Sequence, residues 1–149
     1  MDYVVTISPH NWQIVLKSEP RSFAFRRNEL RKLEQLTTDD RLVIYLAQEM
    51  CWCGVFEVAK PAYRTDAPIF NDVSLRYVVE VRDLVLPQPE HYISVKDSSL
   101  ASKLERFSDV DFEKSGWIYK ARLARSLSML NRTDTDLIIH ALVSQKKNG

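Results

Sequence analysis

The sequence is short of glycine, of net charge and of long apolar runs, and each shortage excludes a class of protein. The three glycines are far apart, so they form no glycine-rich phosphate-binding loop. The net charge of +1 gives no overall attraction to polyanions. No apolar run approaches the ~20 residues that cross a bilayer. Residues 1–10 contain an acid and no basic region, unlike a signal peptide, so we expect a cytoplasmic protein with no membrane partner.

What is present is the composition of a folded domain. Of the 149 residues, 45% are hydrophobic and 28% are charged, which is typical of a globular protein and not of a disordered chain. A chain of this length can bury most of its apolar surface in one domain. No internal repeat, low-complexity tract or linker interrupts it. We therefore predict a single domain over residues 1–149, with residues 143–149 as a frayed tail.

Both cysteines lie in the segment Cys51-Trp52-Cys53-Gly54. Zinc sites use about four ligands, and paired cysteines in them are usually separated by two or more residues. Here one residue separates the thiols, and the three histidines are scattered. On a strand, Cys51 and Cys53 would lie ~6.5 Å apart on the same face, which suits neither a disulfide nor a chelate. We predict buried free thiols, no metal site and no cofactor.

Basic residues are concentrated in two segments despite the low net charge. Residues 17–32 carry six basic side chains against two acids, and residues 114–132 carry five and no acid. Either segment alone could be a solvated surface. If the two segments meet in space, they would form a face that attracts phosphate.

The order of local patterns indicates an α+β fold. Runs rich in β-branched and aromatic residues predict strands at residues 3–7, 41–47, 51–59 and 74–86. Helical periodicity and capping residues predict helices that begin after Ser8, span residues 26–36, begin at Asp97 or Ser98, and begin after Thr133. Residues 121–130 fit a strand or a helix. Because the strands follow one another as hairpins, we predict a largely antiparallel, curled β-barrel surrounded by helices.

Motifs for catalysis are missing. The chain has no H-x-x-x-H pair and no nucleophile elbow. Its close acid pairs, Asp39-Asp40 and Asp109 with Asp111, lie in polar, turn-like contexts that suit capping better than acid–base chemistry. We therefore expect that the protein is not an enzyme.

Large aromatic side chains fall mainly at the ends of predicted elements or in loops. Most large aromatics in a small domain belong to the core. Aromatics beside basic residues at loop mouths can instead form a pocket that stacks a flat ring. The residues concerned are Trp12, Phe23, Phe25, Trp52, Tyr63, Phe70 and Trp117.

Several segments, read in order, carry a family resemblance. "SPHNW" resembles the S-P-x-N-W element near the start of the EVE domain, a member of the PUA-like superfamily, and "SFAF" stands where that family usually has V-W-G-V. "TTDDRLVIYL" and "CWCGVFEVAKPAY" resemble K-P-G-D-K-L-V-F-Y-V and F-A-G-V-F-E-V-x-x-x-x-Y. "RTDAPIF", "RYVVEV" and "GWIYKARLARSLSML" resemble D-D-S-P-I-W, Y-R-V-K-I and W-x-x-x-L-R-G-S-L-R. The resemblance spans nearly the whole chain.

The resemblance implies a curled β-barrel ringed by helices and related to the YTH domain, which reads N6-methyladenine in RNA. It implies a non-catalytic domain that binds modified bases in DNA or RNA, 5-methylcytosine and its oxidised forms among them. Some bacterial members accompany modification-dependent restriction enzymes, which implies a nuclease or modification system as a further partner. The expected base-binding residues are Ser8, Asn11, Trp12, Phe23, Trp52, Gly54, Asp66, Pro68, Phe70 and Trp117, and the expected phosphate-binding residues are Arg26, Arg27 and Arg125. Of these, Trp52, Arg26 and Arg27 are not implied by the resemblance but follow from their residue types, an aromatic ring and two basic side chains.

The chain departs from the family pattern around this implied pocket. Phe23 and Phe70 replace tryptophans, Ala24 replaces a glycine, and Arg26 replaces a proline. Stacking is worth ~1–3 kcal/mol per base, so smaller rings would weaken or redirect binding. A different base, a different modification and a degenerate pocket all stay open. The alternatives are a PUA-like RNA-binding module without modification selectivity, and a protein-interaction module with a degenerate pocket.

Overall fold

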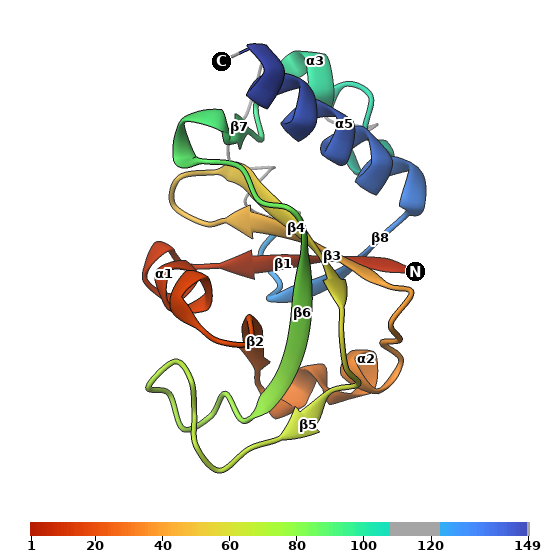
Figure 1. Cartoon of the computed structure of the whole chain (residues 1–149). Helices are drawn as coiled ribbons and strands as arrows, with labels where there is room; N and C mark the ends of the chain where they lie inside the picture. Colours follow the sequence, from red (N-terminus) through yellow and green to blue (C-terminus); the bar gives the residue numbers. More distant parts are fainter. Residues whose placement is uncertain (108–122, 149) are drawn as a thin grey trace.

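The computed structural model describes residues 1–107 and 123–148. Within these residues, one strongly curled sheet is wrapped by helices (Figure 1). The eight-stranded sheet has the order β2-β6-β4-β3-β1-β8, and the short strands β5 and β7 pair with β6 and β4. The strands are β1 (Asp2–Ile7), β2 (Ser22–Phe25), β3 (Arg41–Leu46), β4 (Cys51–Val58), β5 (Tyr63–Arg64), β6 (Tyr77–Val85), β7 (Ile93–Ser94) and β8 (Leu127–Leu130).

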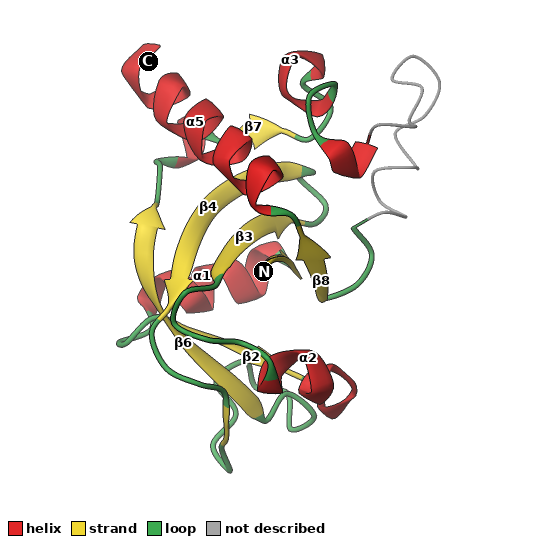
Figure 2. Cartoon of the chain, turned by 90° about the vertical axis from the view of Figure 1, so that its right-hand side faces the viewer, coloured by secondary structure: helices red, strands yellow, loops and turns green. Residues whose placement is uncertain are grey.

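Helices cover both faces of the sheet (Figure 2). Side chains of α1, α2 and β2 belong to one core, and side chains of α3 and α5 belong to the other. None of the described helices is both long and apolar enough to cross a membrane. The helices are α1 (Pro9–Lys17), α2 (Leu30–Glu34), α3 (Ser98–Ala101) and α5 (Arg132–Asn148), and the 3-10 turns are η1 (Arg27–Glu29), η2 (Pro89–His91) and η3 (Glu105–Phe107).

The alternation of side chains along the strands builds two separate cores. In β1, Val5 faces the core under α1, whereas Val4 faces the core under α5. In β4, Cys51 and Cys53 belong to the first core and Trp52 to the second. The central strands therefore bury both of their faces, which explains why they read as nearly continuous apolar runs.

Local capping signals were sufficient to locate two helices. Ser8 accepts a hydrogen bond from the Asn11 backbone N–H at 3.2 Å, and Pro9 occupies the first helical position, as predicted. At α3, Asp97 accepts a hydrogen bond from the Ser99 backbone N–H at 3.0 Å, which decides between the two predicted caps.

Two predicted helices have different limits in the structure. Residues 26–36 do not form one continuous helix but the turn η1 followed directly by the short α2, and Glu29, at the junction of the two, is 6% exposed. The last helix is capped by Asn131 and not by Thr133: the Asn131 side chain accepts a hydrogen bond from the Asp134 backbone N–H at 2.7 Å. α5 extends to Asn148, through residues 143–148 of the predicted frayed tail.

The prediction that strands arrive only as hairpins is wrong for the first pair. β1 pairs with β3 in parallel, with Val5 opposite Ile44, so the intervening α1, β2 and α2 form a crossover. β3 and β4 do form the predicted antiparallel hairpin. The ambiguous segment 121–130 ends in β8, which pairs antiparallel with β1. The fold class is α+β with a curled, mainly antiparallel sheet, as predicted.

Candidate nucleic-acid interface

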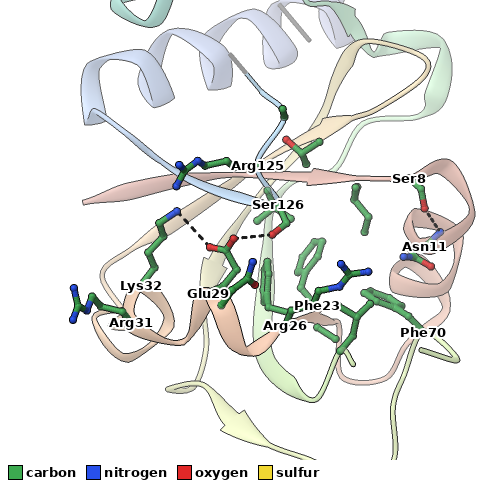
Figure 3. Close-up of a pocket in the computed structure, with 18 residues that line it drawn as sticks. Ser8, Asn11, Phe23, Arg26, Glu29, Arg31, Lys32, Phe70, Arg125 and Ser126 are labelled. Atoms are coloured by element: carbon green, nitrogen blue, oxygen red, sulfur yellow. Dashed lines mark hydrogen bonds and ion pairs between the residues drawn. The ribbon is translucent and has the colours of Figure 1, made fainter. Parts of the chain in front are cut away.

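A hollow of about 760 Å³ opens where the end of β1 meets α1, β2 and the turn from η1 into α2 (Figure 3). We call it the main hollow. The segment 124–126, which leads into β8, closes its other side. It is lined by Val5, Thr6, Ile7, Ser8, Asn11, Phe23, Ala24, Phe25, Arg26, Asn28, Glu29, Arg31, Lys32, Phe70, Leu75, Ala124, Arg125 and Ser126.

The main hollow brings together the two basic segments of the sequence. Arg26, Arg31 and Lys32 come from the first segment, and Arg125 comes from the second. Arg31 and Arg125 are exposed, and neither forms an ion pair within residues 1–107 and 123–144. Because no acid of the described residues pairs with these two charges, this rim can attract the phosphates of a nucleic acid.

Arg26 is held only loosely at the rim. It is 64% exposed at its side chain and lies 3.7 Å from the Asp72 carboxylate. Two hydrogen bonds from Ser74, one from its hydroxyl at 2.6 Å and one from its backbone N–H at 2.9 Å, hold the pKa of the Asp72 carboxyl below its ordinary value. Asp72 is therefore charged at neutral pH, but an exposed pair of this length is weak and Arg26 can exchange it for a phosphate.

Asn11 is placed at the hollow by the cap of α1. The hydrogen bond from its backbone N–H to Ser8 fixes the first turn of the helix. Its half-buried side-chain amide lines the hollow and has no hydrogen-bond partner within the described part of the chain. A primary amide both donates and accepts, so Asn11 can pair with the donor and acceptor atoms of a base edge.

Three phenylalanines form the inner wall of the hollow. Phe23 and Phe25 come from β2, and Phe70 comes from the loop between β5 and β6. They are 1%, 2% and 7% exposed. Phe23 also packs edge-to-face on Phe56, with ring centroids 5.5 Å apart and an interplanar angle of 68°. The wall is therefore aromatic, but much of the Phe23 ring is engaged by the core.

Glu29 is a lining residue that sequence reasoning did not select. It is 6% exposed, and its Oε1 accepts a hydrogen bond from the Ser126 hydroxyl at 3.2 Å. Its Oε2 lies 3.4 Å from Lys32 Nζ but accepts no hydrogen bond from the residues that the structure describes. Figure 3 shows the carboxylate between Lys32 and Ser126. In the sequence, Glu29 stands in a predicted helix close to two arginines, which is typical of an exposed residue on a helix surface.

Two of the tryptophans expected at the pocket lie away from the main hollow. Trp12 is 1% exposed in the core under α1, where its indole N–H donates a hydrogen bond to the Tyr92 hydroxyl at 3.1 Å. Trp52 is also 1% exposed but lies in the core under α5, edge-to-face with Tyr45 at 5.7 Å. Both rings serve packing, because neither lines the hollow.

Gly54 makes room for neighbouring protein backbone, and it does not line the main hollow. A Cβ at this position would lie 3.2 Å from the Val85 carbonyl oxygen and 3.4 Å from a Leu86 methyl carbon. The neighbouring Cys51 and Cys53 are free and buried, as predicted. Among the described residues, no group of three or more His, Cys, Asp or Glu side chains could hold a metal ion.

The other expected residues are distributed around the hollow. Pro68 is half-buried in the same loop as Phe70, whereas Asp66 is exposed and lies 3.5 Å from Arg76. Arg27 lines a second, adjoining hollow. Trp117 lies outside the described residues, as does the acid pair Asp109 and Asp111. Of the thirteen expected residues, the main hollow contains Ser8, Asn11, Phe23, Phe70, Arg26 and Arg125.

Comparison by sequence finds no relative: no family model matches the chain, and no curated protein matches it. Comparison by structure finds many. A YTH domain of Zygosaccharomyces rouxii MRB1, solved in complex with N6-methyladenosine RNA, is 17% identical over 95% of this chain and 86% of that one, with a TM-score of 0.63. The Mmi1 YTH domain in complex with RNA is 13% identical over 97% and 81%, with a TM-score of 0.61.

A bacterial protein, Rpa0253 from Rhodopseudomonas palustris, is similar to the same extent. It is 13% identical over 96% of this chain and 93% of that one, with a TM-score of 0.60. At these identities the likeness shows the fold. The chain therefore has the fold of YTH domains, as the resemblance implied, and its membership of the EVE family stays a prediction.

Proposed function

We propose that this protein is a non-catalytic nucleic-acid-binding domain that takes one unpaired base into the main hollow. The observation that carries the proposal is the composition of the hollow, which joins an aromatic and aliphatic wall to a rim of four basic side chains. Apolar contacts bind the flat face of a base, and guanidinium groups bind phosphate, so the two parts fit the two parts of a nucleotide. The fold shared with YTH domains solved with RNA supports this class of ligand.

Each part of the hollow has a role in the proposed complex. The Asn11 amide, which is unpaired within the described residues, contacts the base edge. The exposed Arg31 and Arg125 contact phosphates on either side of the bound nucleotide. Phosphate contacts position the strand without reading its sequence, whereas contacts to a base edge select the base. Selectivity therefore depends on the inner part of the hollow and affinity on its rim.

The finer proposal is that the bound base carries a methyl group, as in 5-methylcytosine or N6-methyladenine. The lining includes Val5, Ile7 and Leu75, which offer apolar contact for a methyl group beside the ring. Burying one such group is worth about 0.8 kcal/mol, which corresponds to a preference of about fourfold over the unmodified base.

A second candidate is an RNA-binding module without selectivity for modification. The burial of Phe23, at 1% exposed, favours it, because little of that ring is available to stack on a base. A protein-interaction module with a degenerate pocket is less well supported, because the hollow has the basic rim that such a module does not need.

The test is a fluorescence anisotropy titration with single-stranded oligonucleotides of identical sequence that carry 5-methylcytosine, N6-methyladenine or no modification. At about 50 mM salt we expect binding, with at least about a fourfold preference for one modified strand. Equal binding of all strands would favour the unselective RNA-binding module. Absence of binding at this salt concentration would rule out both nucleic-acid functions.

Two variants and one control locate the site. Arg125→Ala should weaken binding to every strand and lower the slope of log K against log salt by about 0.7. Asn11→Ala should instead reduce the preference among strands. Arg82→Ala is the matched control, because Arg82 is 56% exposed at its side chain and lines neither hollow. If Arg82→Ala were as harmful as Arg125→Ala, the main hollow would not be the binding site.

A further inference from the structure

A second hollow of about 700 Å³ adjoins the main hollow and shares Arg26 and Asn28 with it. Among the described residues, its lining includes four arginines and no acidic side chain. We call it the arginine hollow. It is lined by Arg26, Arg27, Asn28, Arg64, Val73, Ser74, Arg76 and Tyr77.

Three separate parts of the chain supply the arginines. Arg27 begins the turn η1, Arg64 ends β5, and Arg76 immediately precedes β6. The pairing of β5 with β6 places Arg64 opposite Tyr77, so the register of the sheet fixes two of the lining residues. The hollow is therefore built by the fold and does not depend on one flexible segment.

The arginines of this hollow are poorly neutralised. Arg27 and Arg64 are exposed and have no ion pair within the described part of the chain. Arg76 donates a hydrogen bond to the Val73 carbonyl at 2.7 Å and lies 3.5 Å from Asp66, whose side chain is 91% exposed. Such exposed pairs are weak, so an incoming anion does not have to displace a strong internal partner.

The two hollows together concentrate positive charge on one part of a nearly neutral protein. In the described part of the chain, seven lysines and arginines line them, and Glu29 is the acidic residue among their linings. The seven are Arg26, Arg27, Arg31, Lys32, Arg64, Arg76 and Arg125.

We propose that the arginine hollow binds the sugar–phosphate backbone next to the nucleotide whose base enters the main hollow. This inference rests on the proposed function and extends it from one nucleotide to at least two. A guanidinium group binds phosphate oxygens through two parallel N–H donors, and four such groups around one hollow suit a phosphodiester chain. The shared Arg26 lies where the strand passes from one hollow to the other.

The half-buried Tyr77 gives this hollow a second feature that suits a nucleotide. Tyr77 lines the hollow together with the arginines while its side chain packs against the core under α1, so only its exposed part can contact a neighbouring base or sugar. Aromatic rings beside arginines are typical of surfaces that bind single strands without reading their sequence. The arginine hollow therefore adds affinity and strand placement, and selection of the base is left to the main hollow.

The test compares Arg27→Ala/Arg64→Ala with the matched control Arg82→Ala, using a fluorescently labelled five-nucleotide single-stranded RNA and its DNA counterpart. Each lost phosphate contact should lower the slope of log K against log salt by about 0.7. For two contacts, the ratio of the affinities at 50 and 200 mM salt should fall by about sevenfold. The control should keep the wild-type slope, and thermal unfolding of each variant checks that the fold is intact.

The outcomes separate this inference from the proposed function. An unchanged slope in Arg27→Ala/Arg64→Ala, with binding still sensitive to Arg125→Ala, would overturn the arginine hollow alone. A reduced slope in Arg27→Ala/Arg64→Ala, with no effect of Asn11→Ala or Arg125→Ala, would support the arginine hollow and overturn the proposed base site. Absence of binding to either strand would overturn both.

Discussion

Ser126 donates a hydrogen bond of 3.2 Å to the Glu29 carboxylate across 97 residues of sequence. This contact joins the turn η1 to the segment that leads into β8, and so it fixes the distance between the two basic sides of the main hollow. The second carboxylate oxygen lies 3.4 Å from Lys32 Nζ, which in turn donates a hydrogen bond to the Leu127 carbonyl at 2.7 Å. The acid thus holds the hollow together and neutralises one of its cations.

Replacing Glu29 with glutamine should strengthen nucleic-acid binding. Glutamine keeps an oxygen that can accept the Ser126 hydrogen bond, but it removes the charge that offsets Lys32. We expect tighter binding of every strand at low salt and a salt slope that is steeper by about 0.7 for single-stranded nucleic acid. Anisotropy titrations at several salt concentrations would measure both. Weaker binding by Glu29→Gln would indicate instead that the carboxylate accepts a hydrogen bond from the ligand.

Phe23 is a poor position for a simple truncation test, because its ring belongs to the core as well as to the hollow. It is 1% exposed and packs on Phe56 at 5.5 Å. Phe23→Ala should lower the free energy of unfolding by about 3–5 kcal/mol. Phe23→Trp, which restores the residue of the resembling family, should lower it by about 1–3 kcal/mol through overpacking.

Urea denaturation would measure both Phe23 variants, with Met129→Ala as the control at a side chain that is 53% exposed. The control should change the free energy of unfolding by less than about 0.5 kcal/mol. If Phe23→Trp were as stable as the wild type, the main hollow would have room for the larger ring, and the departure from the family pattern would have no packing cause.

The parts of the structure that the sequence predicted correctly depend on residues close to one another in the chain. The start of α1 follows from Ser8 and Pro9, because capping depends on residues within one helical turn. The burial and shared face of Cys51 and Cys53 follow from strand alternation. The meeting of the two basic segments was predicted only as a condition, since nothing local brings Arg125 to Arg26.

The sequence could not predict which aromatic rings belong to each of the two cores and which line the hollow. The local sequence suits either burial or a pocket at Trp12, Trp52 and Phe25. The face of the sheet on which each ring lies is decided by strand pairing and sheet curvature, which depend on residues far apart in the sequence. The parallel pairing of β1 with β3 was missed for the same reason. Glu29 was missed because its partner Ser126 is remote in sequence.

Both thiols should react slowly in the folded protein. Burial, with the nearby charge of Glu49 as a smaller cause, raises the pKa of Cys51 to about 11, and burial raises the pKa of Cys53 well above its ordinary value. At pH 8 alkylation should be about a hundredfold slower than for a free cysteine, because the thiolate is the reactive form. The rate at Cys51 should rise about tenfold per pH unit toward pH 11.

Intact-mass spectrometry after iodoacetamide treatment would follow the alkylation, with a urea-denatured sample as the control. The raised pKa also determines how the stability of the fold depends on pH. The protonated thiols stabilise the folded protein fully below the unfolded pKa of about 9, and this stabilisation is lost as the pH rises toward 11. Rapid labelling of the folded protein at pH 8 would show that the β4 segment opens readily.

The buried Asp2 should matter more to stability than any surface acid. Its carboxylate is 0% exposed and accepts hydrogen bonds from the Arg41 backbone N–H at 3.1 Å and from Arg41 Nη2 at 2.9 Å. Removing one partner of a buried ion pair costs about 3–5 kcal/mol, so we expect a loss of this size for Asp2→Ala. Asp2→Asn should cost less, because the amide oxygen can still accept from the Arg41 backbone.

Asp136 provides a matched control, since it contacts the same arginine at the same 2.9 Å but its side chain is 67% exposed. An exposed pair contributes about 0–1 kcal/mol, so Asp136→Ala should leave the protein close to wild-type stability. Urea denaturation of the three variants gives the comparison directly. Equal losses for Asp2→Ala and Asp136→Ala would mean that burial does not set the strength of this network. The expected order, Asp2→Ala then Asp2→Asn then Asp136→Ala, would identify the β1–β3 pairing as dependent on the buried carboxylate, because Asp2 and Arg41 begin these two strands.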